Sequence, residues 1–426
     1  MSDPAPPAPT RGLLRATLTL LAGGAFAQAL PLLLGPWLTR LYTPEAYGRY
    51  QLFATVAINL SVVACARYEF ALPLARADAE VQALRRLCLR ILMVVSGLAL
   101  LGGVGWAWTQ GAAWPLWLGP AVAVGGALSL ATMLAARRQA FQVLAFGRVL
   151  QYGGAAIGQV GAGLMQWGVS GLVMAPVLAQ LATTWLLGRG AVKAPAADDA
   201  AALRLRDVAR RWREFPLLNT PHAFAGALQD TLAVGLIAAT LGPAAAGFWG
   251  LALRYLKAPA TLVGAAVSQA LYPKLAEAGP GVTLAGRAAV RRVMAVLMLA
   301  AAPLVLGLWA LGPWLFGWLF GADWAESGQL ARALALYIGA HFVASPLAVV
   351  TMAWGAQAWA LRLAIWGQLG FVLALVGGLQ VGGLAGAGWA VSLVMAGYFG
   401  WYFWRLANWP LAAGQASSAA GQGGTS

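Results

Sequence analysis

Charged residues inside long apolar stretches are the residues of this sequence best placed to do chemistry. Arg254 and Lys257 lie three positions apart in the apolar stretch 246–272, so a helix would place them on one face. Asp230 lies in the preceding stretch, at a similar predicted depth. A charge at the centre of a membrane costs about 2.5 to 3.5 kcal/mol on insertion scales. Each of these residues is therefore expected to have a partner of opposite charge, to face a water-filled cavity or to serve the function of the protein.

Two interpretations of this charged face remain open. In one, Asp230 and Arg254 form an ion pair that only offsets two buried charges. In the other, Lys257 keeps the face positive, which suits an anionic headgroup such as a phosphate or pyrophosphate. Pro259 follows two residues later and should kink the helix beside the charges, because proline lacks the amide donor.

Four further residues outside this face are candidates. Arg15 precedes the first apolar stretch and Arg67 follows the second, so both could attract phosphates at the cytoplasmic leaflet. Glu69, two residues after Arg67, is expected to form a local ion pair that shapes the loop. His341 and Asp230 are the candidates for coupling transport to proton movement, because histidine titrates near neutral pH.

Metal, cofactor and catalytic signatures are weak in this sequence. Cys65 and Cys88 fall at the expected cytoplasmic ends of two stretches, where a disulfide does not persist. His222 and His341 have no ligand partner at short helical spacing, so no metal site is expected. No catalytic triad, paired carboxylates or phosphate loop appears in a connecting loop. The sequence predicts no cofactor and no enzyme, and it predicts gradient-driven transport.

These residues must be positioned by apolar helices. Of the 426 residues, 61% are hydrophobic and 10% are charged, and the mean hydropathy is +0.72, whereas soluble domains carry about 25% charged residues. A helix needs about 20 apolar residues to cross a membrane, and twelve such stretches predict an all-α polytopic membrane protein. The expected spans are 15–38, 48–66, 89–108, 114–136, 147–166, 169–188, 216–240, 246–272, 292–318, 330–353, 361–380 and 384–404.

The two halves of the chain echo each other at a spacing of about 199 residues. Residues 25–30 resemble residues 223–228, and residues 44–48 resemble residues 243–247. Six spans in each half make the repeat parallel and predict two six-helix lobes with a substrate path between them. The expected parts are a cytoplasmic N-terminal arm (1–14), the first lobe (15–188), a basic cytoplasmic linker (189–213), the second lobe (214–405) and a disordered cytoplasmic tail (406–426).

The net charge of +15 reflects membrane topology better than nucleic acid binding. With the N terminus in the cytoplasm, most of the 28 lysine and arginine residues fall on the cytoplasmic side, as the positive-inside rule requires. Only Arg40, Arg49 and Arg332 fall on the opposite side. Both termini are therefore expected in the cytoplasm, and no nucleic acid partner is expected.

Several motifs resemble those of bacterial polysaccharide-export flippases. These flippases, which include the O-antigen and capsule-unit flippases, belong to the multidrug, oligosaccharidyl-lipid and polysaccharide exporter superfamily. The resemblance is strongest over residues 20–90 and 210–275. Its motifs are LYTPEAYG at 41–48, RYEFALP at 67–73, EFP at 214–216, the stretch from Gly247 to Arg254, and AVSQALYPK at 266–274.

The resemblance implies a substrate, a membrane and a mechanism. Undecaprenyl-pyrophosphate-linked sugar units would move from the cytoplasmic to the periplasmic leaflet of the bacterial inner membrane by alternating access. Cationic cavity residues would meet the pyrophosphate. The implied partners are the lipid-linked oligosaccharide, membrane lipid and other polysaccharide-assembly proteins. Members of the family place charges in both lobes, whereas here the spans of the first lobe look almost uncharged.

Two other functions stay open at this point. A cation-coupled multidrug exporter of the same superfamily would share the fold, but it would use carboxylates within the membrane, of which Asp230 is the clear example. A polysaccharide polymerase or ligase needs a sizeable periplasmic loop with catalytic residues. The longest outer connection expected here is the short stretch 321–329, so the enzyme is the weakest of the three.

Overall fold

The chain folds into helices and short connections in a computed structural model that describes residues 24, 26–189, 204–277 and 282–411. Within these ranges no residue lies in a β-strand. The chain divides into two compact units, Met1–Thr231 and Leu232–Ser426. The predicted arm (1–14), Arg15 and the part of the predicted tail from 412 onward lie outside the described residues.

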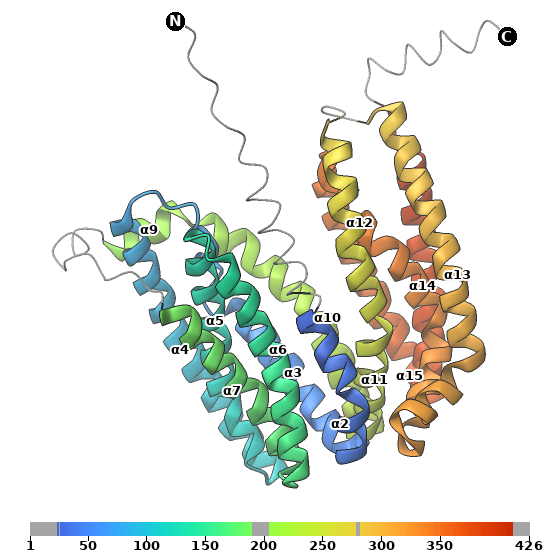
Figure 1. Cartoon of the computed structure of the whole chain (residues 1–426), viewed down its shortest axis with the longest axis horizontal. Coiled ribbons are helices and arrows are strands. Elements are labelled where there is room, and N and C mark those ends of the chain that lie inside the picture. The colour runs from blue at the N-terminus through green and yellow to red at the C-terminus, as the bar shows by residue number, and fades with distance from the viewer. Residues whose placement is uncertain (1–23, 25, 190–203, 278–281, 412–426) are drawn as a thin grey trace, which may run out of the picture. The chain divides into compact units, whose positions relative to one another are not determined.

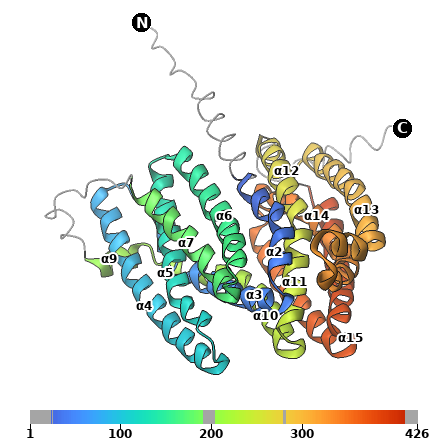
Figure 2. The same cartoon turned by 60° about the horizontal axis from the view of Figure 1, so that its bottom comes forward.

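The first unit is a bundle of long helices in which α4 to α7 lie side by side in both views (Figures 1 and 2). Its elements are the helical residues 26–33, α2 (Gly35–Leu41), α3 (Pro44–Val63), η1 (Tyr68–Ala71), α4 (Asp78–Gln110), η2 (Trp114–Trp117), α5 (Leu118–Arg137), α6 (Phe141–Leu164), α7 (Gly168–Arg189), α9 (Leu205–Arg211), η3 (Phe215–Asn219) and the first half of α10 (Thr220–Leu241).

The second unit packs around α14, which contacts α11, α12, α13 and α15. Its elements are the second half of α10, α11 (Pro243–Leu256), α12 (Ala258–Glu277), α13 (Leu284–Phe320), η4 (Ala322–Trp324), α14 (Ala325–Ala353) and α15 (Gln357–Ala407). More than half of α14 is buried, because helices cover it on several sides.

Every predicted span is largely helical in its described part, which confirms the all-α polytopic fold. The predicted span 246–272 is divided at Lys257 between α11 and α12, and the predicted span 48–66 extends three residues beyond the end of α3. Seven of the described helices are long and apolar enough to cross a membrane. The last helix, α15, holds two predicted spans, which separate where Gly382 and Gly383 leave helical geometry. Gly383 has a φ of +59°, a conformation that glycine adopts without strain. A Cβ on Gly378 would lie 2.5 Å from the carbonyl oxygen of Gly386, so the two halves pack backbone against backbone.

The repeated segments 44–48 and 243–247 each begin a helix, one in each unit. Pro44 begins α3 and Pro243 begins α11, where the missing amide of proline costs no helical hydrogen bond. Thr43 also caps α3, because its side chain accepts a hydrogen bond from the Ala46 amide. This similarity in sequence therefore corresponds to the starts of two helices, as a parallel two-lobe repeat requires.

Part of the predicted linker packs on the first unit. Residues 190–203 lie outside the described residues, but α9 follows them. Its Val208 is buried in the core of the unit, and the Ala209 carbonyl accepts a hydrogen bond from the Tyr68 hydroxyl at 3.2 Å. Just beyond α9, Trp212 Nε1 donates to Glu80 Oε1 on α4 at 3.0 Å. The division into arm, lobes, linker and tail stays a prediction.

Candidate functional site

Arg254 and Lys257 lie at a helix break in the second unit. Arg254 is in the last turn of α11, and Lys257 separates α11 from α12. The break falls where Pro259 predicts a kink, because proline cannot donate to the preceding turn. Both basic side chains are half-buried. A cation at this point is favoured by the negative end of the α11 dipole, so the break holds positive charge at low cost.

Aromatic neighbours of this break pack within the unit. Trp249 is 1% exposed, and its ring centroid lies 6.3 Å from that of Phe371. Tyr255 packs edge to face on Phe320 at 4.6 Å. Trp249 is therefore a core side chain, unable to stack on a sugar in this arrangement.

His341 and Asp230 occupy different surroundings. His341 is half-buried on α14, with its ring 5.9 Å from Tyr337 and 6.3 Å from Phe399. Asp230 has an exposed side chain on α10. The next residue, Thr231, donates a hydrogen bond to the Thr55 carbonyl on α3 at 3.2 Å, which fixes this turn of α10 within the first unit. The ion pair between Asp230 and Arg254 stays a prediction.

A polar cavity of about 320 Å³ lies within the first unit. It brings together residues from the first helix and from α5, α6 and α7. They are Gly24, Gln28, Leu128, Thr132, Leu144, Gly147, Arg148, Gln151, Tyr152, Thr183 and Leu187. The volume is at the low end of the range for small-molecule sites. It suits a headgroup fragment better than a whole oligosaccharide.

Arg148 gives this cavity its charge. It lies seven residues after the start of α6 at Phe141, which is about 10 Å along the helix axis. Gln151 and Tyr152 follow at positions i+3 and i+4, so the three side chains share one helix face. Arg148, Gln28, Gln151 and Tyr152 all carry N–H or O–H donors. The cavity can therefore donate several hydrogen bonds to one anion.

The threonines of the cavity have a different role. Thr132 donates its hydroxyl to the Leu128 carbonyl at 2.7 Å, and Thr183 donates to the Ala179 carbonyl at 2.8 Å. With their protons committed, these oxygens offer acceptor positions. A sugar hydroxyl or water is the natural partner for them, because a phosphate oxygen has no proton to donate.

Sequence reasoning missed Arg148 because it treated this residue as a marker of topology at the end of a span. The helix starts earlier than the predicted span, which moves Arg148 inward by about two turns. The signal that could have found it is the spacing of Arg148, Gln151 and Tyr152, which places three hydrogen-bond donors on one face of a mostly apolar helix. The helix of this predicted span thus carries one charged side chain about two turns from its start, and it lines the cavity.

The chain reverses sharply between α3 and α4, and this turn places Glu69. Ala66 and Arg67 both have positive φ values, +48° and +61°, which cost about 1 to 2 kcal/mol each for residues with a Cβ. The turn brings Glu69, in η1, back against α5, where Ser129 Oγ donates to Glu69 Oε1 at 3.2 Å. The Arg67 guanidinium lies 4.8 Å from the ring of Phe70.

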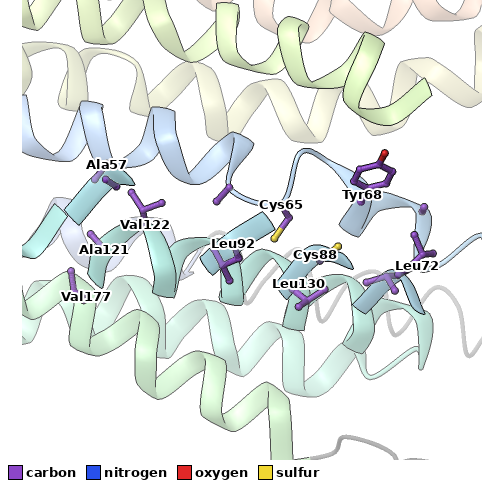
Figure 3. Close-up of a cluster of buried hydrophobic side chains, with 14 of the residues drawn as sticks. Ala57, Cys65, Tyr68, Leu72, Cys88, Leu92, Ala121, Val122, Leu130 and Val177 are labelled. Carbon is purple, nitrogen blue, oxygen red and sulfur yellow. The ribbon is translucent and has the colours of Figure 1, made fainter. Parts of the chain in front are cut away.

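Glu69 lies in a sealed environment outside the membrane-spanning segments. Its side chain is 2% exposed. Burial raises the pKa of this carboxyl, and the nearby Arg67 charge and the Ser129 hydrogen bond act in the opposite direction. Cys65 Sγ and Cys88 Sγ lie within 4.8 Å of each other and of a Glu69 carboxylate oxygen. Figure 3 shows both thiols among the apolar side chains of α3, α4 and α5.

Comparisons with known proteins identify the family and the fold. Residues 115–329, half of the chain, match the family described as "Polysaccharide biosynthesis protein". This match overlaps the second of the two regions in which the sequence resembles flippases. Among curated proteins, none matches the chain.

Several solved transporters share the fold at low sequence identity. The lipid II flippase MurJ, in an inward closed conformation, aligns with a TM-score of 0.65 at 12% identity over 92% of this chain and 89% of its own. A multidrug resistance MATE family transporter of the MOP superfamily, in an inward-facing conformation, aligns with a TM-score of 0.60 at 15% identity over 96% of both chains. A point mutant of the Vibrio cholerae MATE transporter VcmN aligns with a TM-score of 0.53 at 14% identity over 93% of this chain and 95% of its own.

These findings agree with the helical fold described above. The chain is a multi-pass membrane protein with the fold of MOP superfamily transporters, and it belongs to the polysaccharide biosynthesis protein family.

Proposed function

We propose that this protein is a flippase for an undecaprenyl-pyrophosphate-linked oligosaccharide. The substrate is a repeat unit of O-antigen, capsule or exopolysaccharide, and it moves from the cytoplasmic to the periplasmic leaflet of the bacterial inner membrane by alternating access. The polysaccharide biosynthesis family supports this proposal, as does the fold shared with the lipid II flippase MurJ. Flipping makes and breaks no covalent bond, so the protein needs no catalytic residue.

The cavity around Arg148 is the observation that carries the proposal. A guanidinium among membrane helices is costly unless it faces water or an anion. Here it lines a cavity together with Gln28, Gln151 and Tyr152. Guanidinium groups bind phosphates through paired, charge-assisted hydrogen bonds. A lipid pyrophosphate fits this donor set, whereas a cationic drug would be repelled.

Arg254 and Lys257 form the second proposed contact with the pyrophosphate. Both are half-buried at the break between α11 and α12, so the charge lies inside the helical part of the second unit. Arg67 and Arg15 are proposed to attract the substrate at the entry side. Both termini are proposed to lie in the cytoplasm, as the distribution of basic residues predicts.

Transport is proposed to be driven by an ion gradient. Asp230 and His341 are the proposed coupling groups, because they lie on the long helices α10 and α14 and because aspartate and histidine are side-chain types that relay protons in transporters. Proteins that assemble the polysaccharide are proposed partners.

Proteoliposomes test the proposed substrate directly. A fluorescent undecaprenyl-pyrophosphate-linked glycan is placed in both leaflets, and its transfer is followed by quenching from outside. Wild type should transfer the lipid, and Arg254→Ala and Lys257→Ala should each lower the rate about tenfold, as expected when a charge-assisted hydrogen bond is lost. Arg362→Ala is the matched control, because Arg362 is exposed on α15.

The same vesicles test multidrug export, which the shared MATE fold also allows. Cationic dyes are loaded under a proton or sodium gradient in place of the glycan. Dye transport by wild type, with no transfer of the lipid-linked glycan, would replace the flippase proposal with multidrug export.

A further inference from the structure

Two thiols and one carboxylate converge where α3, η1 and α4 meet. Their ligand atoms all lie within 4.8 Å of one another, and the exposed fractions are 2% for Cys65, 2% for Glu69 and 0% for Cys88. Within the described ranges, these residues form the one group of three metal-ligating side chains gathered so closely. Local spacing did not predict the group, because Cys65 lies in the turn after α3 and Cys88 lies on α4.

The ligand types define the cation that would fit. Thiolates bind Zn²⁺ at about 2.3 Å and carboxylates bind it at about 2.0 to 2.2 Å. Such bond lengths place neighbouring ligand atoms of a tetrahedral centre within about 4 Å of each other. Hard cations such as Mg²⁺ and Ca²⁺ prefer all-oxygen sites. Two sulfur ligands therefore select a borderline-soft ion such as Zn²⁺.

The surroundings orient the carboxylate. Ser129 on α5 donates to Glu69 Oε1 at 3.2 Å. The other oxygen, Oε2, is buried and accepts no hydrogen bond from the part of the chain that the structure describes. A buried carboxylate oxygen without a partner costs about 1 to 3 kcal/mol or more. Coordination of a cation would satisfy it, while Ser129 would hold the carboxylate as metal ligands are commonly held.

The charge also balances. Two thiolates and one carboxylate around Zn²⁺ leave one net negative charge, and the Arg67 guanidinium is close enough to act on Glu69 electrostatically. The left-handed turn at Ala66 and Arg67 leads directly into η1, which carries Glu69. Backbone strain of this kind persists where the surroundings fix the chain, and a metal bridge between α3, η1 and α4 would fix it.

We propose that Cys65, Glu69 and Cys88 form a Zn²⁺ site in the first unit, independent of the transported substrate. Binding replaces the protons of the two thiols, and of the Glu69 carboxyl where it is protonated, with two Zn–S bonds and one Zn–O bond, and the released protons pass to solvent. The fourth position is left to water. The ion joins the end of α3 to α4 and stabilises the turn between them.

The competing account is that the thiols are packed core groups. Cys65 Sγ lies 3.8 Å from the Gly126 carbonyl oxygen, as a weak thiol donor would. Both cysteines belong to the apolar core of the unit, and buried cysteine is common in cores. The two accounts differ in metal content, which can be measured.

Metal content at synthesis is the decisive measurement, because a buried site exchanges slowly after folding. The full-length protein is produced in defined medium with Zn²⁺ or Co²⁺ and purified through a tag without histidine. Mass spectrometry of the metal should give about one Zn²⁺ per chain. The cobalt form should show a thiolate-to-cobalt charge-transfer band. This band can come only from Cys65 and Cys88, because the chain has two cysteines.

Variants connect the metal to the three residues. Cys65→Ser, Cys88→Ser and Glu69→Gln should each lower metal content about tenfold or more, whereas Glu80→Gln should leave it unchanged. Glu80 is the matched control, because it is also buried in this unit but pairs with Trp212 and Arg211. Wild-type protein without metal and without the cobalt band overturns the proposal, and this result does not require the variants to fold. A disulfide between the two cysteines in freshly purified protein overturns it as well.

Discussion

The cavity around Arg148 and the cluster of Cys65, Glu69 and Cys88 lie in the same unit but hold their ionisable groups in opposite surroundings. Arg148 has an exposed side chain that lines an open space with other donors. Glu69 is sealed at 2% exposure and held by Ser129. An open site can exchange one ligand for another, whereas a sealed site keeps what it binds.

This difference assigns different tasks to the two sites. Transport requires that the substrate enter and leave, so the open cavity is the place for a passing pyrophosphate. The sealed cluster joins η1 and α4 through side chains that are among the most buried polar groups of the chain. Changes in the cavity should therefore act on transport, and changes in the cluster should act on stability.

A charge reversal in the cavity is the strongest test of this difference between the two sites. Arg148→Glu should lower the flipping rate about 100-fold, because it removes charge-assisted hydrogen bonds of about 1.5 to 3 kcal/mol and adds repulsion of the pyrophosphate. Flipping is measured with the fluorescent lipid-linked glycan, and folding is checked by thermal unfolding in detergent. Arg362→Glu makes the same charge change on an exposed surface of α15 and should have little effect. Equal losses in both variants would show that net charge, and not the cavity, controls transport.

Loss of the carboxylate in the sealed cluster should act on stability. Glu69→Ala removes the acceptor of the Ser129 hydroxyl and leaves a cavity, so it should lower the free energy of unfolding by about 1 to 3 kcal/mol. Unfolding in detergent, followed by circular dichroism against denaturant, measures the change. Glu45→Ala removes an exposed carboxylate that pairs with Arg49 four residues later, and such a pair contributes about 0.5 kcal/mol or less. The same loss in both variants would contradict a special role for the sealed site.

The pH dependence of stability sharpens the contrast further. Burial raises the pKa of Glu69 above its ordinary value of 4.5, so the folded protein holds a proton that the unfolded chain releases. In metal-free protein this contribution is complete below pH 4.5 and is lost as pH rises through the folded pKa. The Glu69→Gln variant has no titratable group at this position, so its stability should not show this decline with rising pH. Thermal unfolding at a series of pH values from 4.5 to neutrality measures both proteins, and parallel curves would assign the decline to other groups.

The smallest expected effect comes from one methyl group in the cavity. A Cβ on Gly24 would lie 3.4 Å from Arg148 Nη1, so Gly24→Ala should shift the guanidinium slightly and change the flipping rate about twofold, in keeping with a fraction of one hydrogen bond. Gly161→Ala on α6 is the matched control, because its Cβ would meet nothing within 4 Å. A larger loss of flipping rate in Gly161→Ala than in Gly24→Ala would show that Arg148 is not part of the transport path.

Much of the fold could be predicted from the sequence. Hydrophobic length is a local property, and each predicted span contains a helix. The break between α11 and α12 was predictable too, because Pro259 removes a hydrogen bond wherever the helix lies. Arg254 and Lys257 were therefore placed correctly at a helix break, while their role stays a prediction.

The two sites of the first unit depend on contacts between helices that are distant in sequence. The cavity needs α5, α6 and α7 to meet the first helix, and the cluster needs a left-handed turn at Ala66 and Arg67 that returns Glu69 to α4 and α5. The assignment of Trp249 to the core depends on such a contact too, since only its packing on Phe371 shows that it is a core residue. Composition and periodicity determined which segments cross the membrane, because each helix satisfies its own backbone hydrogen bonds. Side-chain packing between helices decided which polar groups share a site, because this packing depends on all of the helices at once.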